Sequence, residues 1–158
     1  MRRLLLVTAA IAALALASLA SAAEVTRDSY KAEVEPICKT NTEANEKILK
    51  GVRKLVKEDK LKQAGAQFTK ASKALKQAYT QLKAVPQPPE DSAKLGKWLS
   101  YVKTEAGLFE SAAKALKAGN KTKAQTFVVK LTHNANLANN QVLSFGFRYC
   151  KLEPSKFT

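Results

Sequence analysis

The chain has 158 residues, of which 46% are hydrophobic and 25% are charged, and it carries a formal net charge of +14. This length favours one domain with one hydrophobic core over an arrangement of several domains. The excess of basic residues keeps a protein in solution and attracts it to anionic surfaces, without identifying the surface.

Residues 1–22 predict a secretion signal. The segment starts with two arginines after Met1, continues with an apolar run and ends in Ala-Ser-Ala, the small residues that a signal peptidase recognises. We predict cleavage after Ala22, which leaves one domain over residues 23–158 with 25 basic and 13 acidic residues, a net charge of +12. An uncleaved membrane anchor is the alternative, although the apolar run is shorter than the ~20 residues of a span. No later segment predicts a membrane span.

A first helix is expected at residues 27–57. Its apolar stripe is less regular than those of the later helices, and Asn41 falls on this stripe with Asn45 one turn later. Pro36 is expected to kink this helix or to confine its regular part to the residues that follow. The reason is that proline lacks the backbone donor and clashes with the preceding turn.

Three further helices are expected at residues 60–84, 90–118 and 121–147. In each of them apolar residues recur at alternating spacings of three and four, which is the narrow seam of a coiled-coil-like helix. The three seams are, in chain order, Leu61, Ala64, Phe68, Ala71, Leu75, Ala78, Leu82 and Val85; Leu95, Leu99, Val102, Ala106, Phe109, Ala113 and Leu116; and Ala124, Val128, Leu131, Ala135, Ala138, Val142, Phe145 and Tyr149. No stretch alternates between apolar and polar residues as a half-buried strand does.

The breaks between these helices follow from the residues in the turns. Glu58 and Asp59 precede the second helix, where acidic side chains suit the positive helix N-terminus. The proline-rich run at residues 85–89 cannot continue a helix. Gly119 followed by Asn120 suits the end of one helix and the cap of the next.

These elements predict an all-α fold, an up-down-up-down four-helix bundle closed by one disulfide. In that topology the start of the first helix lies beside the end of the last helix, and Cys38 and Cys150 occupy these two places. Export to an oxidising compartment favours a bond between them, and two buried free thiols are the alternative.

The same topology gathers basic residues around the turn between the first two helices and the turn between the last two. We expect ten basic side chains there against two acidic ones, a local net charge of +8. Lysines that end a helix are favoured by its dipole, whereas lysines that open a helix meet a dipole that is already positive. The candidate anion-binding residues are therefore the four lysines at helix starts, Lys60, Lys62, Lys121 and Lys123. The default interpretation of such a run of charge is nevertheless a solvated basic surface.

A second candidate site is polar. We expect amide side chains of the first and last helices to face each other, because three polar residues of the last helix share one face. The expected buried network contains Asn41, Asn45, His133, Asn136 and Asn140. Such a network either fixes the register of the helices or forms a small-molecule site.

The sequence offers no catalytic, cofactor-binding or metal-binding constellation. It holds one histidine, too few for a histidine-rich zinc site or a carboxylate–histidine di-iron centre. Neither a glycine-rich phosphate loop nor a Gly-x-Ser-x-Gly motif occurs. Glu105 and Glu110 lie five residues apart on the third expected helix, so they point in different directions, and we interpret them as surface groups.

One resemblance extends over most of residues 23–158. The stretches at residues 37–45 and 132–140, together with residues 147–150, resemble a set of small exported proteins of high-GC Gram-positive bacteria. The resemblance implies secretion and a cysteine near each end. It supplies no assigned activity, no catalytic residue and no ligand residue.

We therefore expect a non-enzymatic, secreted protein with a structural or adaptor role at the cell envelope, whose basic end contacts anionic polymers or lipid headgroups. The alternative is a carrier that holds a small ligand between the first and last helices, near the asparagines. An enzyme ranks third, and export argues against a nucleic-acid partner.

Overall fold

Helices account for most of residues 24–156, which are the part of the chain that the computed structural model describes, and no strand occurs among them. The α-helices are α1 (Arg27–Leu49), α2 (Val52–Lys57), α3 (Leu61–Ala84), α4 (Ser92–Lys117) and α5 (Lys121–Gln141). Three short 3-10 helices are η1 (Pro89–Asp91), η2 (Leu143–Phe145) and η3 (Pro154–Lys156). The secretion signal expected at residues 1–22 lies outside the described residues.

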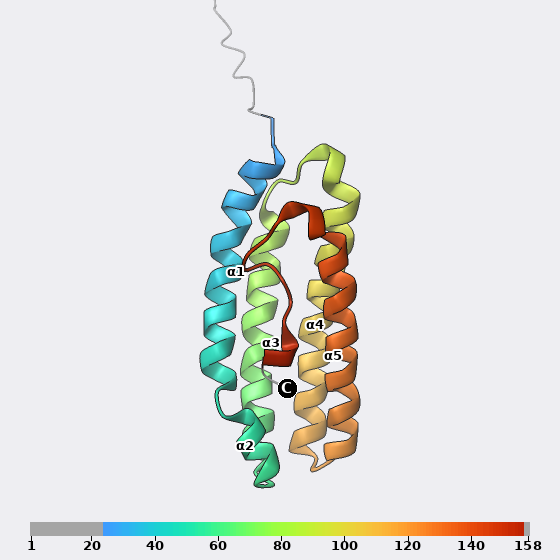
Figure 1. Ribbon diagram of the computed structural model, residues 1–158. Coiled ribbons are helices and arrows are strands. Elements are labelled where there is room, and N and C mark those ends of the chain that lie inside the picture. The colour runs from blue at the N-terminus through green and yellow to red at the C-terminus, as the bar shows by residue number, and fades with distance from the viewer. Residues whose placement is uncertain (1–23, 157–158) are drawn as a thin grey trace, which may run out of the picture.

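The seams of α3 and α4 form the centre of the core. All the seam residues from Leu61 to Leu82 and from Leu95 to Leu116 are buried, as their spacing predicts. Trp98, beside the second seam, is 1% exposed and packs against Phe147 from the chain beyond α5, with ring centroids 5.7 Å apart. α3 contacts α1 and α4, and α4 also contacts α5 (Figure 1). Burial of this apolar surface is the main contribution that favours the folded state.

The first expected helix is divided in two. α1 ends at Leu49 and α2 begins at Val52, because Gly51 takes a left-handed conformation with a φ of 78°. Glycine adopts this conformation without a steric penalty. The prediction of one continuous helix over residues 27–57 is therefore wrong at residues 50 and 51, where the chain turns between α1 and α2. α1 runs through Pro36, so its regular part is not confined to the residues after this proline.

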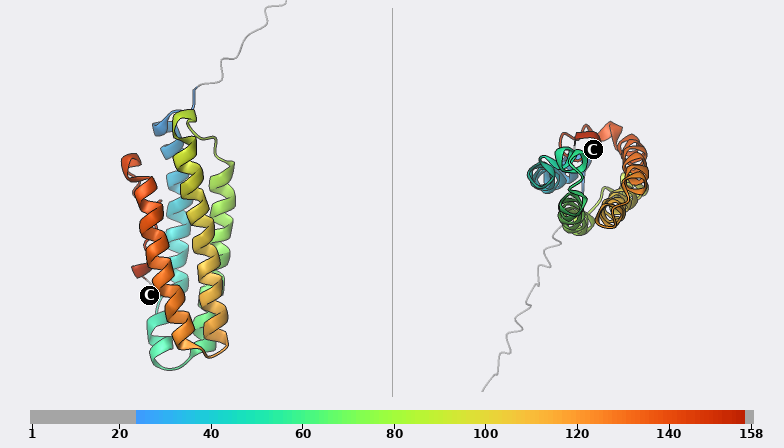
Figure 2. Two further views of the ribbon diagram at one scale, coloured as in Figure 1. Left: turned by 90° about the vertical axis from the view of Figure 1, so that its right-hand side faces the viewer. Right: turned by 90° about the horizontal axis from the view of Figure 1, so that it is seen from below.

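The helices run alternately up and down, as predicted for a four-helix bundle. Among the four long helices, the packed pairs are α1 with α3, α3 with α4, and α4 with α5, so that these helices form an open curve when seen from below (Figure 2). The chain after α5 crosses the gap between α5 and α1 and runs back along the bundle (Figures 1 and 2). We call residues 142–156 the closing segment. It separates the two helices whose amide faces were expected to meet.

A disulfide joins the closing segment to α1 and confirms the predicted pairing. The sulfur atoms of Cys38 and Cys150 are 2.03 Å apart, and 112 residues separate the two cysteines. Cys38 lies halfway along α1 rather than at its start, so the closing segment must fold back to reach it. α5 allows this because it ends at Gln141, earlier than the expected residue 147, and Gly146 reverses the chain with a φ of 59°.

Hydrogen bonds hold the closing segment on both sides. The carboxylate of Glu35 in α1 accepts hydrogen bonds from the backbone N–H groups of Arg148 and Tyr149, at 2.5 and 2.9 Å. On α5, the side chain of Asn139 donates to the carbonyl of Leu152 at 3.0 Å and accepts from its N–H at 2.9 Å. The closing segment therefore pairs several of its backbone groups with the two helices that it separates.

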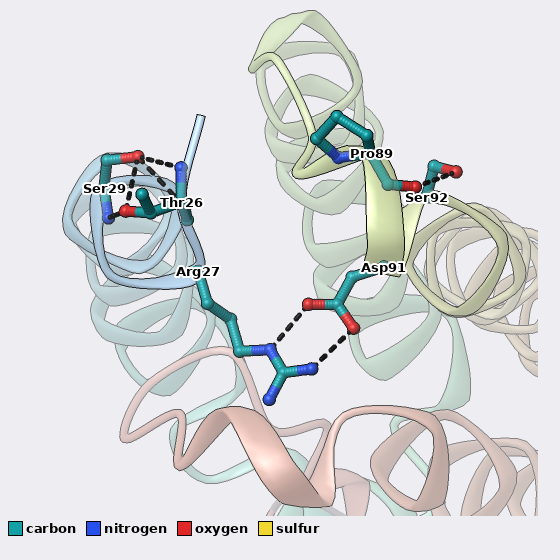
Figure 3. Close-up of polar contacts among 6 residues, drawn as sticks. All are labelled: Thr26, Arg27, Ser29, Pro89, Asp91 and Ser92. Carbon is teal, nitrogen blue, oxygen red and sulfur yellow. Dashed lines mark hydrogen bonds and ion pairs between the residues drawn. The ribbon is translucent and has the colours of Figure 1, made fainter. Parts of the chain in front are cut away.

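Polar contacts fix the upper end of the bundle (Figure 3). α1 begins with a capping box, in which the side chains of Thr26 and Ser29 each accept a hydrogen bond from the other residue's backbone N–H. The guanidinium of Arg27 donates to both carboxylate oxygens of the buried Asp91, at 2.5 and 2.8 Å, and these hydrogen bonds lower the pKa of Asp91. The same guanidinium lies over the ring of Phe145, 5.0 Å from its centroid. Arg27 thus ties α1 to η1 and to the closing segment.

Candidate functional site at the basic end

The lower end of the bundle gathers the basic residues. α2 and the turn that follows it lie beside the turn between α4 and α5 (Figures 1 and 2). We call this the basic end, and its ten exposed cationic side chains are Lys50, Arg53, Lys54, Lys57, Lys60, Lys62, Lys114, Lys117, Lys121 and Lys123. The up-and-down topology therefore concentrates positive charge at one tip of the molecule.

Acidic neighbours neutralise part of this charge. Lys60 pairs with Glu58 at 2.8 Å, and Lys121 pairs with Asp59 at 2.7 Å. The second pair links the start of α5 to the turn before α3. Exposed pairs of this kind contribute only ~0–1 kcal/mol to stability, so they leave both lysines available to exchange partners.

The other two candidate lysines, Lys62 and Lys123, form no ion pair within residues 24–156. The backbone N–H of Lys123 donates to the side chain of Asn120 at 2.8 Å, so the start of α5 is capped by its own chain. At the start of α3 no side chain caps the helix. Of the two helix starts that were expected to bind an anion, the start of α5 is therefore occupied by the side chain of Asn120.

An apolar groove with a volume of about 360 Å³ opens at the basic end, between α2 and α5. Buried side chains of α3 and α4 form its floor, and valines and an alanine of α2 and α5 form its walls. Its apolar lining consists of Val52, Val56, Phe68, Ala112, Leu116, Ala124 and Val128, and its polar rim of Arg53, Lys57, Lys121 and Gln125. No residue of the closing segment lines the groove.

A cationic hollow of about 690 Å³ adjoins this groove along α2. Val52, Arg53 and Lys57 line both depressions. The remaining lining residues of the hollow are mostly charged, namely Glu46, Leu49, Lys50, Gly51, Lys54 and Lys156. An apolar surface and a cationic surface therefore meet along one short helix, which sequence periodicity did not predict because it treated α1 and α2 as one straight element.

The expected polar network forms only within α1. The side-chain amide of Asn45 donates to the side-chain oxygen of Asn41 at 3.2 Å. The three residues expected from the last helix, His133, Asn136 and Asn140, are exposed on α5. The structure does not bring them to the α1 amides, because α5 turns Leu131, Asn134 and Ala138 toward the core instead.

A buried carboxyl group lies where the sequence predicted a surface group. Glu105 in α4 is 2% exposed, and its carboxyl oxygen accepts a hydrogen bond of 2.6 Å from the side chain of Asn134. Burial raises the pKa of Glu105 to about 8, and the hydrogen bond from Asn134 opposes this effect. The available signal was spacing: Glu105 lies three residues after Val102 and four before Phe109, as a seam residue does.

Glu110 does lie at the surface. Lys114 and Lys76 form ion pairs with it at 2.9 and 2.5 Å, and their hydrogen bonds lower the pKa of Glu110 to about 2. The two glutamates of α4 therefore occupy opposite environments.

A cavity of about 50 Å³ lies between Glu105, the two α1 asparagines and the closing segment. The side-chain oxygen of Asn45 is buried there without a hydrogen-bond partner in the described part of the chain. One molecule of liquid water occupies ~30 Å³, so this cavity has room for a water-sized group and not for a carried organic ligand, whose sites are roughly 300–1,000 Å³.

Residues 24–156 contain no group of three or more His, Cys, Asp or Glu side chains placed to hold a metal ion. None of the helices described is both long enough and apolar enough to cross a membrane. Comparisons with protein-family models, with curated protein sequences and with solved structures find no match to this chain.

Proposed function

We propose that this protein is a non-enzymatic, extracytoplasmic helical bundle that associates through its basic end with anionic lipid headgroups of the cell envelope. The observation that carries the proposal is the apolar groove that opens among cationic side chains at that end. An anionic polymer uses the charge alone, whereas a lipid surface uses both the charge and the apolar groove.

The charge of the basic end is large enough for this role. Its ten basic residues face two acidic ones in the adjoining turn, and Glu110 pairs with Lys114, so ten positive and three negative charges leave a local net charge of +7. Each lysine or arginine near an anionic membrane surface contributes ~1 kcal/mol to attraction, and this contribution falls off within a Debye length. Even partial engagement of the basic end therefore supports association at moderate ionic strength.

The proposal is tested by sedimentation of the protein with lipid vesicles. We expect binding to vesicles that contain phosphatidylglycerol, weaker binding at high salt, and no binding to phosphatidylcholine vesicles. A quadruple variant, in which Lys60, Lys62, Lys121 and Lys123 become Gln, is expected to bind at least tenfold more weakly.

The matched control replaces four exposed lysines away from the basic end by Gln, namely Lys73, Lys83, Lys97 and Lys103. It has the same net charge as the first variant, so it separates local charge from total charge. Equal losses in both variants would show non-specific attraction and would count against the proposal. Binding to soluble teichoic acid but not to vesicles would assign the basic end to a polymer instead.

A further inference from the structure

The groove at the basic end is apolar surface that no described part of the chain covers. Val56 and Val128 in its walls are only partly buried, although Val52 of α2 and Ala124 of α5, which also line the groove, are buried. Elsewhere the gap between α1 and α5 is filled by the closing segment, but η3, the last part described, lies above α2 (Figure 1). Within residues 24–156 the closing segment therefore leaves this gap uncovered at the basic end.

We propose that this groove binds the alkyl chain of an anionic, single-chain amphiphile, with the headgroup held by cationic side chains at its rim. The volume of about 360 Å³ lies at the lower end of the roughly 300–1,000 Å³ typical of small-molecule sites, which suits one chain. The inference rests on the proposed function, because it assigns the ligand to the same basic end.

The sign of the headgroup follows from the rim. Lys57 and Arg53 line both the groove and the adjoining cationic hollow, and Lys121 lies on the opposite rim. Lys57 makes no ion pair within residues 24–156. The rim carries no acidic residue, so a phosphate or carboxylate there meets complementary charge while a cationic headgroup is repelled.

The test is isothermal titration calorimetry with dodecyl phosphate below its micellar concentration. We expect one molecule bound per protein chain. Decyl phosphate, which is shorter by two methylenes, is expected to bind roughly fifteenfold more weakly, because each buried methylene strengthens binding about fourfold. Inorganic phosphate tests the headgroup without an alkyl chain, and dodecyltrimethylammonium tests the same alkyl chain with a headgroup of opposite charge. Neither is expected to bind in the concentration range in which dodecyl phosphate binds.

Two neighbouring valines of α5 provide a matched pair of variants. Val128 lines the groove, whereas Val129 is 61% exposed and lies outside it. We expect Val128→Gln to weaken binding of dodecyl phosphate about tenfold and Val129→Gln to leave it unchanged. Val128 is only partly buried, so glutamine is tolerated there without unfolding, which a circular dichroism melt checks. Lys57→Gln is expected to weaken binding about threefold.

The absence of saturable binding by dodecyl phosphate would overturn the inference, and so would equal affinities of the two valine variants. A dimer that light scattering detects and that Val128→Gln dissociates would assign the groove to a second copy of the chain. Vesicle binding without amphiphile binding would overturn this inference and keep the proposed function. If dodecyl phosphate binds but the two quadruple lysine variants bind vesicles equally, the inference about the groove stands and the proposed function is overturned.

Discussion

Glu105 shows how a single side chain can depart from the pattern around it. It lies beside the seam of α4, next to Ala106, and is 2% exposed. It shares the small cavity with Asn45, whose side-chain oxygen has no partner in the described residues. A carboxyl group in such a place is less costly when protonated, because a buried charge loses its hydration. The neutral form can also donate a hydrogen bond, which the ionised form cannot.

This residue predicts a pH-dependent stability. Because the pKa of Glu105 is about 8 in the folded chain and 4.5 is its ordinary value, the folded state retains a proton that the unfolded state has lost between these pH values. The free energy of unfolding therefore falls as the pH rises from about 4.5 to about 8. One pKa unit corresponds to ~1.4 kcal/mol, so the total effect is a few kcal/mol at most.

Urea unfolding at several pH values measures this effect. Glu105→Gln keeps an acceptor for Asn134 and removes the titration, so the variant is expected to exceed the wild type in stability at pH 8 and to approach it at pH 5. Glu33→Gln, at an exposed position of α1, is the control. The other ionisable side chains that line this cavity belong to the closing segment, namely Lys151, Glu153 and Lys156. Both variants keep these three side chains, so a difference between the variants reports on Glu105. The prediction would be refuted if the free energy of unfolding depended on pH in the same way for the wild type and for Glu105→Gln.

At the scale of elements, α3 and α4 approach each other closely at a glycine. A Cβ atom added to Gly65 would lie 2.9 Å from the carbonyl oxygen of Ala113 and 2.8 Å from the side chain of Lys117. Lys117 can move, but the α4 backbone cannot shift without disturbing the core. Gly65 therefore sets the distance between the two central helices just above the basic end.

Gly65→Ala is expected to destabilise the protein by ~1–3 kcal/mol, because overpacking forces backbone shifts. Gly107→Ala is the matched change, since nothing lies within 4 Å of a Cβ at this exposed position of α4. It is expected to stabilise by ~0.5–1 kcal/mol, because alanine favours a helix interior. Thermal melts of both variants test the pair, and equal shifts of the same sign would contradict this account.

The sequence predicts these central elements well and the peripheral ones less well. The seams of α3 and α4 were predictable because both helices bury one regular stripe against neighbours on either side. The path of the closing segment could not be predicted, because its contacts join residues more than a hundred positions apart, as the contact between Glu35 and Tyr149 does. The basic end was predictable as a cluster of charge, whereas its groove depends on Gly51, whose left-handed turn ends α1 and offsets α2.

At the scale of the whole molecule, the disulfide joins α1 covalently to the closing segment. The loop it closes spans 112 residues, for which the chain-entropy relation gives ~4–5 kcal/mol of stabilisation. The bond also holds the closing segment in the gap between α1 and α5. Its loss therefore affects the closing segment first, while the packing of α3 on α4 does not depend on it.

The double variant Cys38→Ser, Cys150→Ser is expected to lose up to ~4–5 kcal/mol of stability. Its helix content at low temperature should nevertheless remain close to that of the wild type, because the central seams are intact. Guanidinium unfolding and far-ultraviolet circular dichroism measure the two quantities separately. Reduction of the wild type by dithiothreitol is expected to reproduce the variant, and an unchanged unfolding midpoint would contradict the prediction.

The contact between Trp98 and Phe147 gives the molecule an optical reporter of its own closure. Trp98 is the only tryptophan in the chain, and one side of its buried ring is covered by the closing segment. When that segment detaches, the indole meets water and its fluorescence emission shifts to longer wavelength, although the helices persist. Stopped-flow fluorescence after mixing with reductant would therefore measure the rate at which the closing segment detaches, separately from global unfolding and without any added dye.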